Sequence, residues 1–165
     1  MTDAEGHATL PDDPADRARA VVEAVVAALG VGGEVRVAES EAEIEVSVDG
    51  EDDAALLIGK HGATIDALQH IAARAAFQGA DRDRKRVVID AGGYRERRQT
   101  ALERAADRAV EDAVSFGRSV ELDPMNSFER RIVHTHLKDR TDVETHSEGD
   151  EPERRLVVSP LRPTA

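Results

Sequence analysis

The sequence contains no cysteine and no tryptophan, and only one tyrosine and three phenylalanines among its 165 residues. Without cysteine, the chain has no disulfide, no thiolate metal site and no cysteine nucleophile, as is typical of proteins in a reducing compartment. No apolar run approaches the roughly 20 residues that a membrane-spanning helix needs, and the N-terminal residues lack the apolar stretch of a secretory signal. We therefore expect a cytoplasmic protein with no membrane partner.

Basic residues are outnumbered by acidic ones, 22 to 34, so the formal net charge is −12. The acidic excess is confined to residues 1–58, which hold 15 acidic and 3 basic residues, whereas residues 59–165 hold 19 of each. The total charge argues against a nucleic-acid ligand, but the field at one face matters more than the total. Basic patches beyond residue 58 are therefore compatible with a polyanionic ligand.

Hydrophobic periodicity predicts an α+β protein of two small domains. Residues 1–13 are polar and aperiodic, which indicates a disordered acidic tail. The first domain, at 14–91, is predicted to have the element order αββααβ, with its first two strands antiparallel. Its expected helices cover 14–29, 54–58 and 63–78, and its expected strands lie around 35–37, 44–48 and 87–89.

The second domain is predicted to cover residues 92–160. It begins at two consecutive glycines, Gly92 and Gly93, which interrupt the hydrophobic periodicity. Asn126 has the position of a helix N-cap, and Glu129 follows in the register of a capping box. Residues 119–122 are compatible with a short strand or an extended linker, and 161–165 with a loose tail. The expected helices cover 94–116 and 127–138, and two closing strands are expected at 143–147 and 155–159.

The periodicity also predicts which helical residues face the core. In the helix at 63–78 the apolar face is Ile65, Leu68, Ile71, Ala72, Ala75 and Ala76. In the long helix it is Ala101, Leu102, Ala105, Ala109, Ala113 and Phe116. In the last helix it is Phe128, Ile132, Val133 and Leu137.

A short glycine-containing segment, Gly59-Lys60-His61-Gly62, lies between two predicted helices. It lacks the further glycine and the Ser or Thr of a phosphate-binding P-loop. Two glycines nevertheless let a backbone pass close to a polyanion, and the N-terminus of the following helix adds free N–H groups and partial positive charge. Lys60 and His61 add donors at the tip of the loop. The alternative is a plain corner between helices, but the αββααβ order favours a binding loop.

Apolar residues flank this segment on both sides. Ile58 and Ile65 are expected to support bases once the loop holds the backbone of a nucleic acid. Because aromatic residues are so few, extensive stacking on bases is not expected.

A second candidate site lies on the last predicted helix. Arg130 and His134 are four residues apart and share one face, which Lys138 continues, while Arg131 lies about a quarter turn away. A guanidinium and an imidazole on adjacent turns make a compact phosphate site. The alternative is a solvated basic stripe.

Two stretches of the sequence resemble known domains. Residues 57–69, LIGKHGATIDALQ, closely resemble the GxxG segment of a type II KH domain, whose loop clamps about four nucleotides. Residues 124–134, PMNSFERRIVH, resemble the signature of an R-three-H domain, which is associated with single-stranded nucleic acid. This order of domains is that of the Jag family of bacterial RNA-binding proteins, also called KhpB or EloR, and the resemblance covers about residues 14–160.

The resemblance implies a type II KH domain at 14–91 and an R-three-H domain at 92–160. It implies binding of single-stranded RNA, with single-stranded DNA as a second possible ligand, in post-transcriptional control connected with cell elongation or division. It also implies a small single-KH-domain protein as partner. The residues expected to bind RNA are Ile58, Gly59, Lys60, His61, Gly62, Ile65, Arg130, Arg131, His134 and Lys138.

Two other classes of protein compete with this expectation. A protein-interaction adaptor with negligible RNA affinity is favoured by the net charge and by His61, because a histidine is mostly neutral at pH 7. An enzyme is disfavoured, since no carboxylate pair has a recognisable catalytic frame. His134 and His136 point about 200° apart on a helix and do not chelate one metal. We therefore expect no catalysis, no metal and no cofactor.

Overall fold

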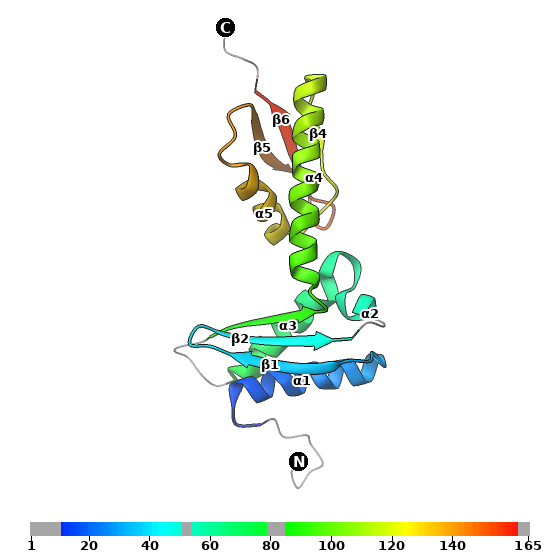
Figure 1. Cartoon of the computed structure of the whole chain (residues 1–165), viewed down its shortest axis with the longest axis vertical. Coiled ribbons are helices and arrows are strands. Elements are labelled where there is room, and N and C mark those ends of the chain that lie inside the picture. The colour runs from blue at the N-terminus through cyan, green and yellow to red at the C-terminus, as the bar shows by residue number, and fades with distance from the viewer. Residues whose placement is uncertain (1–10, 51–53, 79–84, 162–165) are drawn as a thin grey trace. The chain divides into compact units, whose positions relative to one another are not determined.

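The computed structural model describes residues 11–50, 54–78 and 85–161 (Figure 1). The chain divides into two compact units, Met1–Tyr94 and Arg95–Ala165, here called the N-terminal and C-terminal units. Of the two predicted tails, residues 1–10 and 162–165 lie outside the described residues. The domain limits drawn from the sequence stay predictions.

The N-terminal unit has the element order that the periodicity predicted, so the αββααβ prediction is confirmed. A single turn of 3₁₀ helix, η1, separates the second helix from the third. The elements are α1 (Pro14–Leu29), β1 (Glu34–Glu39), β2 (Glu43–Asp49), α2 (Ala54–Ile58), η1 (Lys60–Gly62), α3 (Ala63–Ala76) and β3 (Arg86–Ala91).

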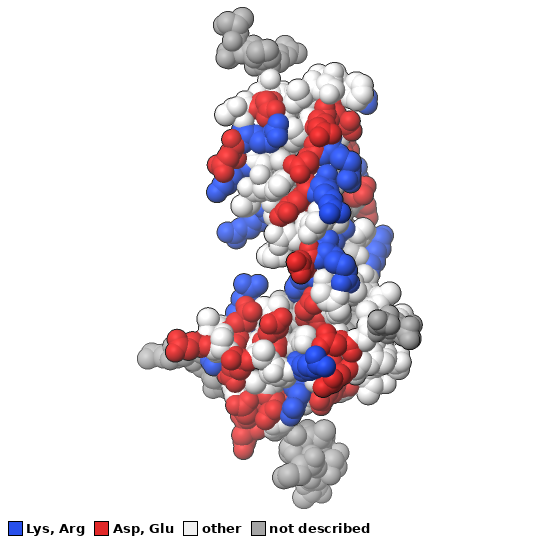
Figure 2. All heavy atoms as spheres, viewed as in Figure 1, with Lys and Arg blue, Asp and Glu red and all other residues white. Residues whose placement is uncertain are grey.

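The sheet of this unit has the strand order β1-β2-β3, in which β1 and β2 are antiparallel and β2 and β3 parallel. Alternation along β2 buries Ile44, Val46 and Val48 on the face that α1 and α3 cover. The alternate residues, such as Glu45 and Asp49, are exposed. Figure 2 shows acidic side chains gathered over this unit, in agreement with the charge asymmetry of the sequence.

The C-terminal unit comprises a long helix, a second helix and a three-stranded antiparallel sheet in the order β4-β6-β5. The stretch that the sequence left open as strand or linker forms a two-residue strand. The capping box at Asn126 and Glu129 is confirmed. The elements are α4 (Tyr94–Phe116), β4 (Val120–Glu121), α5 (Ser127–Leu137), β5 (Val143–Glu148) and β6 (Arg155–Pro160).

Four predicted core residues are in fact exposed: Ile71 is 56% exposed, Phe116 66% and Phe128 58%, and Ala101 is exposed as well. On α4, Leu102, Ala109 and Ala113 are buried as predicted, and Ala106 and Val110, which were not predicted, are buried beside them. Alanine on several sides of a helix defines the edges of the apolar face poorly, so individual residues at those edges were misplaced. In the residues that the structure describes, no helix is both long and apolar enough to span a membrane.

Candidate nucleic-acid interface

The GxxG segment forms a tight connection between α2 and α3. The Gly59 N–H donates to the Ala55 carbonyl at the end of α2, at 2.9 Å, and the Gly62 N–H donates to the Gly59 carbonyl, at 3.3 Å. The φ angles are 71° at Gly59, 52° at His61 and 79° at Gly62. Three positive φ angles so close together turn the chain sharply between the two helices.

Both glycines of this loop are required by space as well as by conformation. A Cβ at Gly59 would overlap with Thr64 Oγ1, and a Cβ at Gly62 would lie 2.9 Å from the Tyr94 hydroxyl oxygen. Gly59 has φ 71° and ψ −178°, a combination that is essentially restricted to glycine. The loop therefore packs closely on its own unit, and no other residue type fits either position without strain.

The tip of the loop carries the two donors that the sequence singled out. The side chains of Lys60 and His61 are exposed and make no hydrogen bond or ion pair with any described residue. No side chain caps α3, whose N-cap is Gly62; the Ala63 N–H donates to the Lys60 carbonyl, and the helix N-terminus carries a partial positive charge. The loop thus presents one ammonium, one imidazole and a helix N-terminus at the same place.

The apolar residues beside the loop are not equivalent. Ile58 is partly exposed, whereas Ile65 has no exposed surface and belongs to the core. The expectation that Ile65 contacts bases therefore needs correction: it holds α3 on the sheet from beneath. Leu56 on α2, which sequence reasoning did not single out, is 56% exposed.

The second candidate site differs from its prediction at Arg130. The Arg130 side chain is 11% exposed. Its Nη1 donates to the Met125 carbonyl at 2.6 Å, and its Nη2 to Glu151 Oε1 at 2.7 Å. Arg130 lies three residues before buried Val133, at the edge of the apolar face of α5, which explains why it is not on the open surface with Lys138.

The neighbouring residue Glu129 is buried as well, with 4% of its surface exposed. It accepts a hydrogen bond from Arg98 Nε at 2.6 Å and closes the capping box through the Asn126 N–H. The first turn of α5 therefore buries two opposite charges, each with its own partner. Burial of this kind is tolerated because both charges are hydrogen-bonded.

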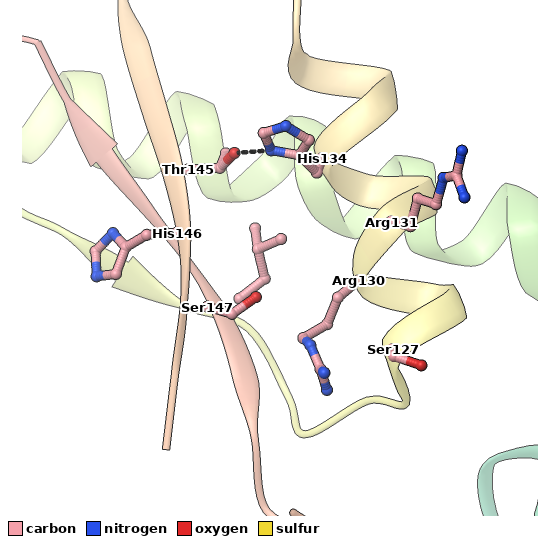
Figure 3. A pocket seen from close by; sticks show the side chains of 8 residues that line it. Ser127, Arg130, Arg131, His134, Thr145, His146 and Ser147 are labelled. Carbon is pink, nitrogen blue, oxygen red and sulfur yellow. Dashed lines mark hydrogen bonds between the residues drawn. The ribbon is translucent and has the colours of Figure 1, made fainter. Parts of the chain in front are cut away.

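Residues of α5, β5 and β6 line an open cavity of about 380 Å³ (Figure 3). His134 Nδ1 lies 2.6 Å from Thr145 Oγ1, which fixes the orientation of the imidazole. Figure 3 shows the Arg130 side chain directed between the helix and the strands, whereas Arg131 extends to the other side of α5. The lining residues are Ser127, Arg130, Arg131, His134, Thr145, His146, Ser147 and Leu156.

The cavity brings together residues that the sequence did not connect. Thr145, His146 and Ser147 come from a strand that lies outside the Arg-His motif, and no spacing rule pointed to them. The exposed Arg131 side chain and His134 Nε2 make no hydrogen bond or ion pair with any described residue. Lys138, at the C-terminal end of α5, is exposed but does not line the cavity.

Comparison with known proteins agrees with this architecture. Residues 17–89 match the KH domain of KhpA and KhpB, and residues 100–160 match the R-three-H domain. The chain is 32% identical over 152 residues to RNA-binding protein KhpB of Bacillus subtilis, a match that covers 91% of this chain and 72% of that protein. The chain belongs to the KhpB family. The family expected from the two motifs is thereby confirmed.

Other KhpB proteins are similar over different lengths. RNA-binding protein KhpB of Clostridium symbiosum is 37% identical over 151 residues, which cover 92% of this chain and 66% of that protein. The protein of the same name from Lactiplantibacillus plantarum is 43% identical over 104 residues, which cover 63% of this chain and 32% of that protein. This chain therefore spans less than two thirds of either relative, and each relative has residues outside the match.

Proposed function

We propose that this KhpB-family chain binds single-stranded RNA through two sites, the GxxG loop and the cavity between α5 and β5. The observation that carries the proposal is the loop itself. Both of its glycines are required for close packing, and it presents Lys60 and His61 without partners among the described residues, beside an uncapped helix N-terminus. Such a loop can hold a phosphodiester backbone by its N–H groups and its cationic tip.

At the first site, Gly59 and Gly62 give the loop its shape, and the exposed Lys60 and His61 contact phosphates. The partly exposed Ile58 supports a base beside the loop, and Ile65 supports the loop from the core. Binding at this site is therefore led by charge and backbone contacts.

At the second site, Arg131 and Lys138 provide exposed charge at the surface of α5. His134 Nε2 provides a hydrogen-bonding group whose direction Thr145 fixes. Arg130 reaches a phosphate only where the Glu151 carboxylate moves away from Nη2. These groups are spread over the surface of α5, and together they contact a second stretch of phosphates of the same strand.

Two weak sites on one chain strengthen each other, because the first contact raises the effective concentration of RNA at the second. The proposal includes a KH domain at residues 14–91 and an R-three-H domain at residues 92–160. RNA as the ligand implies the cytoplasm as the compartment. The family resemblance further suggests post-transcriptional control connected with cell elongation or division, a small single-KH-domain partner, and single-stranded DNA as a competitor.

The test compares two variants that carry the same change of charge at different places in the N-terminal unit. Lys60→Asp places the change at the tip of the loop, and Arg74→Asp places it in the last turn of α3, where Arg74 is exposed. We expect Lys60→Asp to weaken binding of a labelled single-stranded RNA by about tenfold or more, since a charge-assisted hydrogen bond is lost. Arg74→Asp is expected to change affinity about twofold.

Equal losses in the two variants would show that RNA senses only the overall charge of the unit. No binding by the wild type at low salt would instead favour the adaptor, to which the acidic surface of the N-terminal unit is suited.

A further inference from the structure

A single aromatic side chain lies directly beneath the second glycine of the GxxG loop. Gly62 is buried, and a Cβ built on it would lie 2.9 Å from the Tyr94 hydroxyl oxygen, 3.1 Å from Cε1 and 3.4 Å from Cζ. Three atoms of one phenol therefore fill the space that any other residue at position 62 would need. Since Lys60 and His61 are exposed while Gly62 is buried, the phenol lies on the inner side of the loop.

Tyr94 is held in place by the sheet rather than by the loop. The Gly92 N–H donates to the Val48 carbonyl at 3.0 Å, and the Gly93 N–H donates to Asp90 Oδ2 at 2.7 Å. These bonds close a tight turn at the end of β3, and Tyr94 follows it as the first residue of α4. Its partly buried ring also packs against the hydrophobic core of the N-terminal unit.

The two glycines of the loop thus rest on different kinds of support. Gly59 packs on Thr64, which lies five residues later in the first turn of α3. Gly62 packs on Tyr94, which lies 32 residues later and is anchored to β3. The second contact ties the loop directly to the end of β3, in addition to the packing of α3 on the sheet.

We propose that Tyr94 is a positioning residue for RNA binding: its phenol is the floor that holds the GxxG loop, with Lys60 and His61, in the binding conformation. This inference rests on the proposed function of the loop. The physical effect is preorganisation, because a loop that is already ordered loses less conformational freedom when RNA binds. Tyr94 itself does not contact the RNA.

The first arm of the test needs no RNA. Tyr94→Ala is compared with Phe77→Ala, since Phe77 is partly buried against the same core at the opposite end of α3. We expect amide hydrogen exchange at Gly62, whose N–H is bonded to the Gly59 carbonyl, to speed up about tenfold or more in Tyr94→Ala and to stay unchanged in Phe77→Ala. Unchanged exchange in Tyr94→Ala would overturn the proposal whether or not the protein binds RNA.

The second arm measures binding of a labelled single-stranded RNA across salt concentrations. Tyr94→Ala is expected to weaken binding about tenfold while the slope of affinity against salt stays that of the wild type, since the same phosphates are neutralised. Tyr94→Phe keeps the ring and is expected to bind within about threefold of the wild type. Where the alanine variant does not fold, Tyr94→Leu keeps apolar bulk against the core but removes the ring from beneath Gly62.

The outcomes separate this inference from the function on which it rests. An RNA affinity unchanged in Tyr94→Ala, beside a loss in Lys60→Asp, would overturn the positioning role and leave RNA binding intact. Absence of RNA binding in the wild type would overturn the proposed function, while the exchange arm would still decide whether Tyr94 holds the loop.

A spectroscopic readout is available because Tyr94 is the single tyrosine of the chain. Labelling with 3-fluorotyrosine gives one fluorine resonance. We expect RNA to shift it in the wild type and in Arg131→Ala, but not in Lys60→Asp. A resonance that RNA leaves unshifted in the wild type, although Lys60→Asp weakens binding, would overturn the proposal.

Discussion

The two candidate RNA-binding regions differ in what holds their cationic groups. In the GxxG loop, the backbone is fixed by close packing at Gly59 and Gly62, and the side chains of Lys60 and His61 have no partner among the described residues. On α5, the side chains themselves are held: Arg130 binds Met125 and Glu151, and His134 binds Thr145.

The difference shows that a basic residue in a motif does not always offer its charge to a ligand, because another side chain of the protein can already bind it. The loop offers its charge to solvent and relies on glycine for its shape. The α5 site gains shape from hydrogen bonds between side chains, but one of its cations is already neutralised by a carboxylate. Substitution of the exposed loop cations should therefore affect affinity, substitution of a loop glycine should affect stability as well, and substitution of the buried Arg130 should affect both affinity and stability.

The largest expected effect concerns the loop glycines. Gly59→Ala combines a conformation restricted to glycine with an overlap on Thr64, and we expect it to lower the free energy of unfolding by about 3 kcal/mol and to abolish binding by the loop. Gly30→Ala is the matched control, since Gly30 has φ 66° with open space around it. It is expected to lower the free energy of unfolding by about 1 kcal/mol. Urea unfolding measures both, and equal losses would contradict the steric argument.

The next effect distinguishes the two arginines of α5. Arg130→Ala leaves the Met125 carbonyl without its donor and Glu151 without its counter-ion, so we expect the free energy of unfolding to fall by about 1–3 kcal/mol. Arg131→Ala should change stability by less than about 0.5 kcal/mol, because Arg131 is exposed. Its expected effect is on RNA affinity. Equal free energies of unfolding for the two variants would show that the hydrogen bonds of Arg130 to Met125 and Glu151 do not stabilise the protein.

The smallest expected effect tests whether Glu151 competes with RNA for Arg130. Glu151→Gln removes the carboxylate that pairs with Arg130. We expect RNA to bind about two- to fivefold more tightly, with a steeper salt dependence. Glu153→Gln makes the same change of charge at an exposed position of the same turn and is expected to have less effect. A Glu151→Gln variant that binds RNA no better than Glu153→Gln would show that the ion pair does not limit access to Arg130.

The order of helices and strands could be predicted because apolar residues alternate along the strands and recur at helical spacing in the helices. What failed was the direction of particular side chains. Phe116 is the last residue of α4, and Phe128 lies in the first turn of α5. A side chain at a helix end has a neighbouring helical turn on one side only, so it is less well covered. Both were predicted to be buried and are exposed.

The candidate site was predictable only as far as its local motifs reach. The residues of the GxxG segment are consecutive, and Arg130 and His134 are only four residues apart, so the residue types and spacing of both motifs were visible in the sequence. The contact of Gly62 with Tyr94 and the ion pair of Arg130 with Glu151 join residues 32 and 21 positions apart. No periodicity encodes such contacts, and a basic side chain gives no sign from the sequence alone that a distant carboxylate binds it.

The most direct test of the two-site account is equilibrium binding of a labelled single-stranded RNA, titrated across salt. The wild type is measured beside Lys60→Asp/His61→Asp and Arg131→Ala/His134→Ala, which leave the buried Arg130 untouched. The account predicts clear binding by the wild type, with a slope of about −0.7 per phosphate neutralised, and weaker binding with a shallower slope in each variant. Binding that neither variant weakens, or no binding by the wild type at low salt, would contradict it.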